Sequence, residues 1–527
     1  MSERIPGIVL VSLIALLMSG ISELSQAQED NGALLAWRFY VDEYDIESSL
    51  LFRPEDPINP KPLVIRDVTV IDLPDGRLLH EHAVYLNNDL IEWVGPQDEL
   101  EIPEDAQVID GEGGFLAPGL IEMHAHTLTT SADYLTQIGA GVTTIREMDG
   151  FPWLLQRKSQ VEAGELFAPS MFVTGMILNG SDFGGYALAV NSPEEARAAV
   201  REQAADGFDA IKIHNSINLE IFDAIMAEAH AVGLDVVGHN PQPVSVSHVM
   251  QSGMRTVEHL KGYIDDGTLT ISDQDWVTPS IGVDIYLAPT FMAYREHLRG
   301  ADAMAIVNGP DGRLVHPRIK ATWVTAAGQE VDRVTELRQN ILPMQKEIFE
   351  KLRLHNMKWI AGTDSGGYNN FVPGPALIGE IEMFESLGLS PLEALKTATT
   401  NAADAMRWSD RVGRVAPGLQ ADLILLDANP LETTSNLRSI RSVVVRGQWI
   451  EDATAVLHSP SRVWKKSATP KTVPTHKEVE NHLAKRMALK KRGYAFNHLQ
   501  LQQLEYYIEE FGYEDLAQDT QKLRFEQ

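Results

Sequence analysis

The stretch Ala117-Pro-Gly-Leu-Ile-Glu-Met-His-Ala-His-Thr127 decides the fold. A Pro-Gly turn follows its first residue, a short apolar run comes next, and two histidines separated by one residue, His124 and His126, stand near its end. Side chains at positions i and i+2 of an extended strand project from the same face, so both imidazoles point into one space. Two neutral imidazoles at a strand end supply half of a metal site. A complete site then requires further ligands at later strand ends.

The middle of the chain alternates predicted strands and predicted helices. Ser192 and Pro193 mark one helix start, since serine is a favoured N-cap and proline suits the first helical position. Gly233 marks the end of another helix, over residues 219–232. Short apolar runs predict strands at 142–145, 210–214, 234–239, 256–259, 285–290 and 358–364. Repeated strand and helix units predict the α/β class, and a TIM-like (β/α)₈ barrel over 113–410 rather than an open sheet.

Short β-rich runs flank this middle part on both sides. Pro74-Asp75-Gly76 separates two of them in the N-terminal flank, and the C-terminal flank holds a matching pair. The four runs lie at 63–73, 83–94, 421–426 and 443–448. We therefore expect one small β-sandwich domain formed from both chain ends, over residues 61–112 and 411–452.

Residues 1–27 have the features of a secretory signal peptide. Arg4 lies in a short polar start, an apolar run extends from Ile8 to Met18, and Ser25-Gln26-Ala27 has the small-x-small pattern of a cleavage site. At about 1.5 Å per helical residue the apolar run covers roughly half of a hydrocarbon core of about 30 Å, so a membrane span is the poorer interpretation. We expect an exported protein, periplasmic or secreted, without membrane association after signal cleavage. Residues 28–60 form an N-terminal extension with no clear period.

Residues 453–527 form a predicted C-terminal helical extension. Lysine and arginine are frequent between Arg462 and Arg492, and apolar residues then recur at helical spacing from Leu501 to Phe511. One interpretation is helices that pack on the barrel or on a neighbouring subunit. The other is a basic arm that binds a partner.

The long segment 264–343 is predicted to hold one strand and otherwise irregular polar sequence. Such a segment could form a lid over the barrel mouth or a dimer contact.

Composition restricts the function classes. The chain has 74 acidic and 44 basic residues and a formal net charge of −30, which argues against a surface for nucleic acid or anionic membranes. We expect a small-molecule substrate and a homo-oligomer. The chain contains no cysteine, which excludes disulfides and thiolate chemistry. A metal must therefore be held by histidine, by carboxylate or by a group made from lysine.

Candidate ligands stand at the ends of separate predicted strands. In a (β/α)₈ barrel the C-terminal ends of the strands form the mouth in which active sites lie. Chance is a poor explanation for so many ligand-type residues at this edge. They are His124, His126, Lys212, His239, His259 and Asp364.

The sequence resembles the amidohydrolase superfamily, and within it the imidazolonepropionase-like branch that contains prolidase-type dipeptidases. The similarity extends roughly from Leu63 to Gly447. Its motifs are Ala117-Pro-Gly-Leu-Ile-Glu-Met-His-Ala-His126, Gly141-Val-Thr-Thr-Ile-Arg146, Ala210-Ile-Lys-Ile213, Gly362-Thr-Asp-Ser365 and Val415-Ala-Pro-Gly-Leu-Gln-Ala-Asp-Leu-Ile424. The resemblance implies a (β/α)₈ barrel beside a β-sandwich assembled from both chain ends.

The resemblance also implies a two-metal site. His124, His126 and Asp364 would hold the buried ion, and His239 and His259 the more exposed one. Zn²⁺ suits imidazole and carboxylate ligands, while Mn²⁺, Co²⁺ and Fe²⁺ stay open. Lys212 would react with CO₂ to form a carbamate that bridges both ions. Without the carbamate, the alternative for Lys212 is an ion pair with Asp364 beside a single metal.

The implied reaction is hydrolysis of a C–N amide bond by metal-activated water, in a dipeptide such as Xaa-Pro or in an N-acyl amino acid. Asp364 would collect the proton and return it to the leaving nitrogen. Arg146 is a candidate for binding a substrate carboxylate, or alternatively for a salt bridge with Glu147 or Asp149. His214 would line the pocket or act as a hydrogen-bonded wall residue. Further pocket candidates are Tyr263, Tyr286, Tyr368 and Asn369.

Other activities on the same fold stay open. Deaminase relatives carry a proton-shuttling glutamate three residues after the third metal histidine, whereas Gln242 occupies that position here. Lactone or carbamate hydrolysis would use the same ligands on a different substrate. A non-catalytic scaffold would lose ligands, and all six positions are present.

Overall fold

The computed structural model describes residues 60–127, 131–181, 187–265, 282–295, 333–355, 357–366 and 371–453, together with short strands at 44–45, 268–269 and 465–466. The predicted signal peptide, nearly all of the N-terminal extension and nearly all of the C-terminal extension lie outside the described residues. Tyr368 and Asn369 lie outside them as well. The two-residue strands β1 (Tyr44–Asp45) and β22 (Lys465–Lys466) pair with each other.

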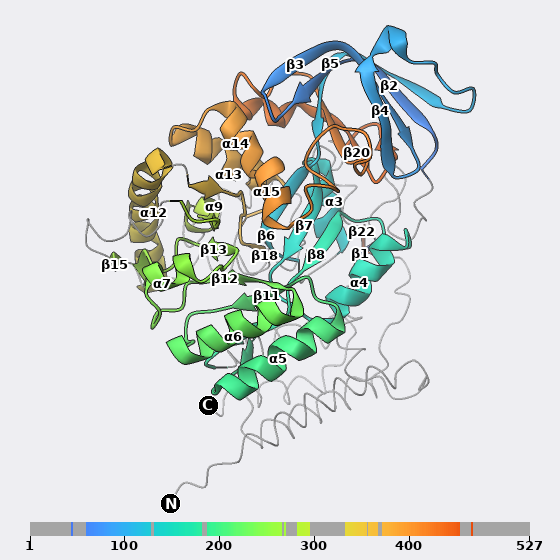
Figure 1. Cartoon of the computed structure of the whole chain (residues 1–527). Coiled ribbons are helices and arrows are strands. Elements are labelled where there is room, and N and C mark those ends of the chain that lie inside the picture. Colours follow the sequence, from blue (N-terminus) through green and yellow to red (C-terminus); the bar gives the residue numbers. More distant parts are fainter. Residues whose placement is uncertain are drawn as a thin grey trace, which may run out of the picture. The chain divides into compact units, whose positions relative to one another are not determined.

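Parallel strands form the centre of the mixed α/β fold (Figure 1). Most of their residues are buried, because both faces of a barrel strand are covered. The strand positions, in chain order, are β6 (Leu120–His126), β7 (Val142–Glu147), β8 (Ser170–Val173), β11 (Ala210–Ile213), β12 (Asp235–Gly238), β13 (Thr256–Glu258), β16 (Tyr286–Ala288) and an interrupted last position made of β17 (Lys358–Trp359) and β18 (Ser365–Gly366). Two further strands, β9 (Ile177–Asn179) and β10 (Ala187–Ala189), extend the sheet beside β11.

Hydrogen bonds join the first and last strand positions. β18 pairs in parallel with β6, and the Met123 amide donates to the Ala361 carbonyl at 3.0 Å. A parallel bridge between Thr174 and Ala210 connects the β8 side to β11. All strands of the ring therefore point the same way, and their C-terminal ends meet at one mouth.

Helices cover the outside of the strands and begin at strong local signals. The Ser192 side chain accepts the Glu195 amide at the start of α5, and α6 ends at Gly233 with a left-handed φ of 79°. Figure 1 shows α5 and α6 side by side next to β11. The helices are α3 (Ser131–Gly139), α4 (Pro152–Glu162), α5 (Pro193–Asp206), α6 (Leu219–Val232), α7 (Val246–Gln251), α9 (Phe291–Arg295), α12 (Arg333–Leu352), α13 (Pro375–Ser386), α14 (Pro391–Thr397) and α15 (Thr400–Ala405).

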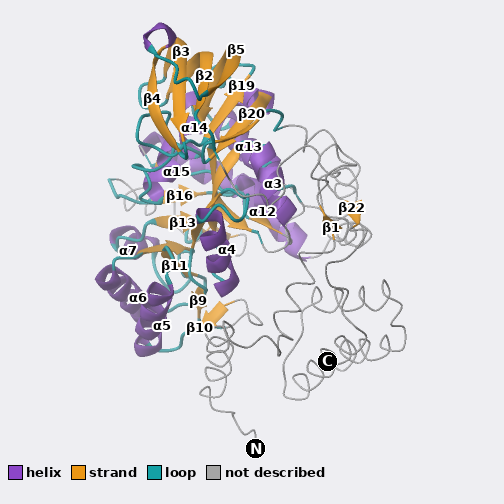
Figure 2. Cartoon of the chain, turned by 90° about the vertical axis from the view of Figure 1, so that its right-hand side faces the viewer, coloured by secondary structure: helices purple, strands orange, loops and turns teal. Residues whose placement is uncertain are grey.

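A second sheet combines strands from both flanks of the barrel (Figure 2). Its order is β21-β20-β19-β5-β2-β3-β4, in which β2 and β5 are parallel and β5 and β19 antiparallel. Its inward side chains, such as Leu63, Val84 and Leu423, form a core of their own. The strands are β2 (Leu63–Asp72), β3 (Arg77–Asn87), β4 (Leu90–Pro96), β5 (Gln107–Pro118), β19 (Leu423–Leu426), β20 (Ile440–Val445) and β21 (Gln448–Ile450).

Gly119 joins β5 of this sheet directly to β6 of the barrel. A Cβ atom at this position would lie 2.2 Å from Thr143 Oγ1, so only glycine fits. Its amide donates to the Asp422 carbonyl at 2.9 Å. The chain therefore passes from the sheet into the His-x-His strand without a loop, which fixes the direction in which that strand enters the barrel.

Asp422 anchors the sheet to the barrel from the other flank. Its buried carboxylate accepts the Arg446 amide and the Gln420 side-chain amide, both at 2.7 Å. Gln420 also donates to Ser170 Oγ of β8 at 2.9 Å. Burial raises the pKa of Asp422, which its hydrogen bonds oppose.

Helix α12 corrects the expectation of irregular sequence up to residue 343. The helix begins at Arg333 and passes through Pro343. Beyond the proline it buries Gln345, Ile348, Phe349 and Leu352 at helical spacing. Packing of this face against the barrel compensates for the hydrogen bond that proline cannot donate.

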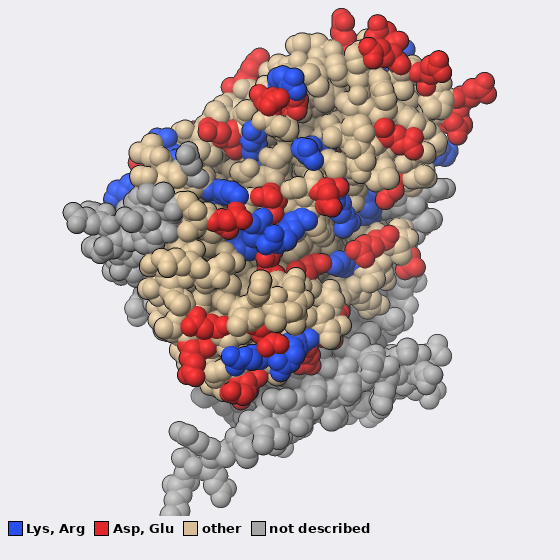
Figure 3. All heavy atoms as spheres, viewed as in Figure 1, with Lys and Arg blue, Asp and Glu red and all other residues tan. Residues whose placement is uncertain are grey.

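The charged surface is mixed. Figure 3 shows acidic and basic side chains on the visible face, with a group of basic side chains near its centre and acidic ones around it. Among the ion pairs of the described residues are Arg407 with Asp235 and Lys358 with Asp284, both at 2.6 Å. Within the described ranges, no helix is long and apolar enough to cross a membrane.

We predict that Asp422→Ala lowers the free energy of unfolding by about 2–3 kcal/mol, because it leaves two buried donors without an acceptor. Asp427→Ala is the matched control, since Asp427 pairs with Arg441 at 3.4 Å while 60% of its side chain is exposed. Its effect should stay below about 0.5 kcal/mol. Urea unfolding of both variants measures the difference. Equal losses would contradict the anchoring role of Asp422.

Candidate metal centre

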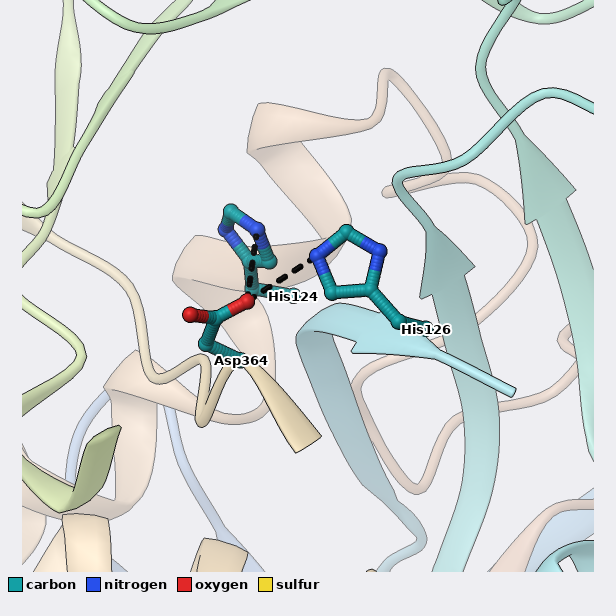
Figure 4. Close-up of side chains that lie close together, drawn as sticks. All are labelled: His124, His126 and Asp364. Carbon is teal, nitrogen blue, oxygen red and sulfur yellow. Dashed lines mark ion pairs between the residues drawn. The ribbon is translucent and has the colours of Figure 1, made fainter. Parts of the chain in front are cut away.

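Three predicted ligands form a compact cluster at the mouth of the barrel. The ligand atoms of His124, His126 and Asp364 all lie within 4.8 Å of one another. Asp364 Oδ1 is 2.9 Å from His126 Nε2 and 3.5 Å from His124 Nε2. Figure 4 shows this carboxylate oxygen pointing at both imidazoles. The two histidines come from β6, and Asp364 comes from the segment that leads into β18.

The structure brings the other two predicted histidines to the same place. His239 directly follows β12, and His259 directly follows β13. The ring centroid of His259 lies 4.8 Å from that of His124 and 4.9 Å from that of His239. Four imidazoles from three strands therefore line one buried space.

Each of the four imidazoles has an oxygen at its Nδ1 atom. Glu258 lies 3.0 Å from Nδ1 of His124, and Asp149 lies 2.9 Å from Nδ1 of His126. The remaining two contacts are Asn215 Oδ1 with His239 at 2.7 Å and Thr290 Oγ1 with His259 at 2.6 Å. These four partners were not predicted as site residues, because none carries a motif of its own.

These contacts determine which ring nitrogen can bind a cation. The Thr290 hydroxyl donates to the Pro289 carbonyl at 2.7 Å, so its oxygen accepts a proton from His259 Nδ1. Carboxylates can only accept, so the hydrogen bond to Glu258 assigns the same tautomer to His124. With Nδ1 protonated, Nε2 carries the lone pair, as in metal-binding histidines supported by an outer oxygen. The donor set of four imidazoles and a carboxylate fits a divalent metal.

The pKa values of two neighbouring histidines of the site are shifted in opposite directions. Burial lowers the pKa of His126, but the carboxylates of Asp149 and Asp364 outweigh burial and raise it to about 10. Burial and the neighbouring Lys212 lower the pKa of His124 to about 4. The carboxylates of Asp149 and Asp364 place negative charge at His126, and a bound cation would balance this charge.

Lys212 lies in β11 with its side chain inside the ring. Its Nζ atom is 3.5 Å from His124 Nε2, and only 1% of the residue is exposed. Burial lowers the pKa of Lys212, although nearby carboxylates oppose the shift. Burial thus favours the neutral amine, which is the nucleophilic form of lysine.

Arg146 does not reach the mouth, which corrects its prediction as a substrate-binding residue. It is 1% exposed and donates to the Met123 carbonyl at 2.6 Å, to Thr256 Oγ1 at 3.1 Å and to Glu258 Oε1 at 2.8 Å. Strand alternation turns the Arg146 side chain into the barrel interior. The alternative of a salt bridge with Glu147 or Asp149 named the wrong partner, because the acceptor comes from β13.

Glu258 connects this buried arginine to the metal ligands. Its carboxylate accepts from Arg146, from Thr256 Oγ1 at 2.5 Å and from His124 Nδ1. Burial alone would raise the pKa of Glu258, but Arg146 and His124 hold it far below its usual range. The charged carboxylate is therefore a fixed acceptor beneath His124.

A second buried carboxylate fixes the segment that carries Asp364. Glu122 Oε1 accepts the amides of His124 and Thr363, both at 2.9 Å, and Oε2 accepts the Thr363 hydroxyl at 2.7 Å. Asp364 has a φ of 60°, a left-handed conformation that costs energy in a residue with a side chain. Burial raises the pKa of Glu122 to about 7, against the effect of these donors. Glu122 thus ties the two strands whose ligands form the cluster.

Two of the tyrosines predicted to shape the pocket lie elsewhere. Tyr263 is 2% exposed within the hydrophobic core, with its hydroxyl 3.9 Å from Met250 Sδ of α7. Tyr286 is the first residue of β16, so it stands at the opposite end of the barrel from the mouth. Its hydroxyl donates to Asp404 there, and the Arg255 and Lys358 cations lie over its ring. The sequence places Tyr286 in the right strand but at the wrong end.

His214 lies beside the site, as the alternation of β11 predicts. Its ring centroid is 3.9 Å from that of His239. Burial and the Lys212 cation lower the pKa of His214 to about 3, so its imidazole is neutral. A neutral ring stacked on His239 forms part of the wall of the site.

A family comparison matches this arrangement. The model of the amidohydrolase family matches residues 115–450, which is more than half of the 527 residues. The chain belongs to the amidohydrolase family. As a member of it, the protein is a hydrolase of carbon–nitrogen bonds, and metal dependence is typical of the family.

Curated relatives of this family member are distant. Imidazolonepropionase from Anaeromyxobacter sp. is 24% identical over 448 residues, which cover 75% of this chain and 97% of the relative. Adenine deaminase from Rubrobacter xylanophilus is 23% identical over 394 residues, which cover 73% of this chain and only 57% of the relative. Relatives with different activities at similar identity show the family and leave the substrate open.

Solved structures of relatives have the same fold. The bottromycin amidohydrolase matches with a TM-score of 0.64 at 22% identity, over 84% of this chain and 98% of that chain. A Xaa-Pro dipeptidase with bound methionine matches with a TM-score of 0.58 at 20% identity, over 74% and 100%. These neighbours imply a TIM barrel with a β-sandwich domain, and the parallel strands of the barrel and the separate sheet from both flanks correspond to that architecture.

We predict that Asn215→Ala weakens binding of a divalent metal by about 10- to 100-fold, because His239 loses the acceptor that fixes its tautomer. Asn218→Ala is the matched control in the same loop. The Asn218 side chain caps α6 through the Ile221 amide at 3.0 Å, so its loss should cost about 1 kcal/mol of stability without changing metal affinity. Equilibrium dialysis against Zn²⁺ measures the affinities. Equal affinities in the two variants would contradict the role of Asn215.

Proposed function

We propose that the protein is an exported two-metal amidohydrolase that hydrolyses the amide bond of a small substrate, either a dipeptide such as Xaa-Pro or an N-acyl amino acid. The observation that carries the proposal is that four imidazoles, Lys212 and Asp364 lie close together at one end of the barrel. His124, His126 and Asp364 would hold one ion, and His239 and His259 the other. Zn²⁺ is the preferred metal because the chain offers imidazole and carboxylate ligands.

Lys212 is proposed as a carbamate formed with CO₂. Its amine is buried, its pKa is lowered, and its Nζ atom lies 3.5 Å from His124 Nε2. In the reaction the lone pair of the neutral amine attacks the carbon of CO₂, one C=O bond becomes a C–O⁻ bond, and a proton leaves the nitrogen. The product is anionic, so it replaces a cation that would repel the metals with a ligand for both.

A bound pair of divalent ions would supply hydroxide at neutral pH and polarise the substrate carbonyl. Asp364 is the residue of this chain that moves the proton. Its carboxylate is kept charged by His126 and the other imidazoles, although burial opposes this, so its pKa lies far below the usual range. It can accept a proton at the cluster and donate it to the leaving nitrogen. Glu122 holds the backbone of the preceding residue, Thr363, and the Asp364 amide itself donates to the His124 carbonyl at 2.8 Å.

Lys261 is the cation that we propose for the substrate carboxylate, in place of Arg146. It lies two residues after His259 and is partly buried. Burial and nearby cations lower the pKa of His239, and Lys261 is one of these cations. A positive charge next to the site suits a substrate that carries a carboxylate, as dipeptides and N-acyl amino acids do.

Deamination is the weaker proposal, although an adenine deaminase is among the relatives. Gln242 stands three residues after His239, where a deaminase of this fold needs an acid to shuttle protons. An amide cannot take that role. The buried Lys212 also favours the two-metal amide hydrolase.

We predict that Lys212→Ala loses at least one bound metal and nearly all amidase activity, and that short carboxylic acids restore part of both. The added carboxylate occupies the space of the carbamate and bridges the ligand groups. Metal content after dialysis, with and without propionate, measures the effect separately from turnover. Full metal content in the unsupplemented variant would contradict the carbamate.

We predict that Lys261→Met raises KM about 10- to 100-fold for substrates with a free carboxylate and changes kcat little, because a charge-assisted hydrogen bond contributes about 1.5–3 kcal/mol. The same substrates capped as carboxamides serve as the control, since they have no charge to lose. Equal effects on both series would contradict the assignment.

The substrate class is tested with a panel of dipeptides and N-acyl amino acids on the metal-loaded protein, beside Asp364→Asn. The proposal requires turnover of at least one class and a loss of about 10²- to 10⁴-fold in Asp364→Asn. Turnover of lactones or carbamates alone would refute the substrate class. Undiminished amide hydrolysis in Asp364→Asn would refute the role of Asp364.

A further inference from the structure

His259 has an unusual backbone for a metal ligand. Its φ is 59°, and the next residue, Leu260, has a φ of 54°. Both lie in the left-handed region, which costs about 1–3 kcal/mol for each residue with a side chain. Such a conformation persists only where surrounding contacts hold it. The His259 imidazole can face the other ligands only while this turn is maintained.

Gln345 of α12 provides contacts that hold the turn. Its Nε2 atom donates to the His259 carbonyl at 3.3 Å and to the Pro289 carbonyl at 2.7 Å. Both partners are acceptors, which requires the NH₂ group of the amide on this side. Gln345 is 0% exposed, so water cannot take its place as the donor to the two carbonyl oxygens.

These contacts close a ring of hydrogen bonds around His259. The His259 ring donates to Thr290, the Thr290 hydroxyl donates to the Pro289 carbonyl, and Gln345 joins that carbonyl to the His259 carbonyl. The ring fixes both the backbone and the imidazole of one residue. Among the residues of this ring, Gln345 is the one that lies on a helix, α12, and not in a loop after a barrel strand.

Glu380 of α13 holds the far side of the same ring. Its buried carboxylate accepts the amides of Phe291 at 2.9 Å and Met292 at 2.8 Å, immediately after Thr290. The segment that follows Thr290 therefore has a tie to α13 that does not pass through Gln345. The contribution of Gln345 is the direct tie to the backbone of His259.

We propose that Gln345 is a positioning residue that holds His259 as a metal ligand, so that α12 sets the affinity of the metal position served by His239 and His259. The proposal rests on the proposed two-metal function. Gln345 touches neither substrate nor metal and acts through His259 alone. A merely structural glutamine would change stability without changing the two metal affinities differently.

The test is a metal titration of the full-length protein with Gln345→Leu, which keeps the side-chain size and removes both donors. Co²⁺ is the spectroscopic probe, and Zn²⁺ dialysis gives the stoichiometry. Gln203→Leu is the matched control, because Gln203 is a buried glutamine whose Nε2 donates to the Met176 carbonyl at 2.8 Å and contacts none of the ligands.

We expect wild type and Gln203→Leu to bind two ions, and Gln345→Leu to bind the weaker ion about 10- to 100-fold less tightly with the tighter one unchanged. Excess metal should restore kcat in Gln345→Leu. Equal affinities in Gln345→Leu and Gln203→Leu would overturn the inference. Fewer than two ions in the wild type would instead overturn the two-metal function. If Gln345→Leu does not fold, Gln345→Asn replaces it in the same metal titration. The asparagine side chain is one methylene shorter, so its amide does not reach both carbonyl oxygens.

Discussion

The hydrogen bond between Glu258 and His124 is the interaction on which the rest of the site depends. A charged carboxylate in the barrel interior is expensive unless donors surround it. Here Arg146 neutralises its charge, Thr256 donates to it and His124 Nδ1 completes the set. The same contact orients the His124 lone pair toward Asp364 and Lys212. The Glu258 carboxylate is thus the acceptor both for the buried Arg146 and for the candidate metal ligand His124.

Strained backbone at two ligands is the second constraint. His259 and Asp364 both have left-handed φ values, and each is held by a buried side chain on a neighbouring element. Glu122 gathers donors around Asp364, and Gln345 gathers acceptors around His259. The cost of each strained turn is offset by hydrogen bonds that are protected from water. The ligands are therefore positioned before any cation arrives.

The family and the α/β class could be predicted from sequence because their signals are local. The signals are His-x-His on one strand, a lysine in a later buried run and an aspartate after Gly-Thr. Each can be recognised at its own position in the sequence, and the structure brings the three together. The supporting residues could not be predicted, since their roles depend on distant partners. Arg146 finds its acceptor 112 residues further along the chain, and Gln345 reaches His259 across 86 residues. The prediction that Tyr286 shapes the pocket was wrong because the sequence of a three-residue strand does not reveal at which end of the strand a residue lies.

The most direct test of the account is a zinc-edge anomalous diffraction map from crystals of the Zn²⁺-loaded protein. The account predicts two peaks about 3.5–4 Å apart, as in two-metal sites, one bound by Nε2 of His124 and His126 and the other by Nε2 of His239 and His259. Continuous density from Lys212 Nζ to both peaks would complete the prediction. A single peak, or ligation through an Nδ1 atom, would contradict it.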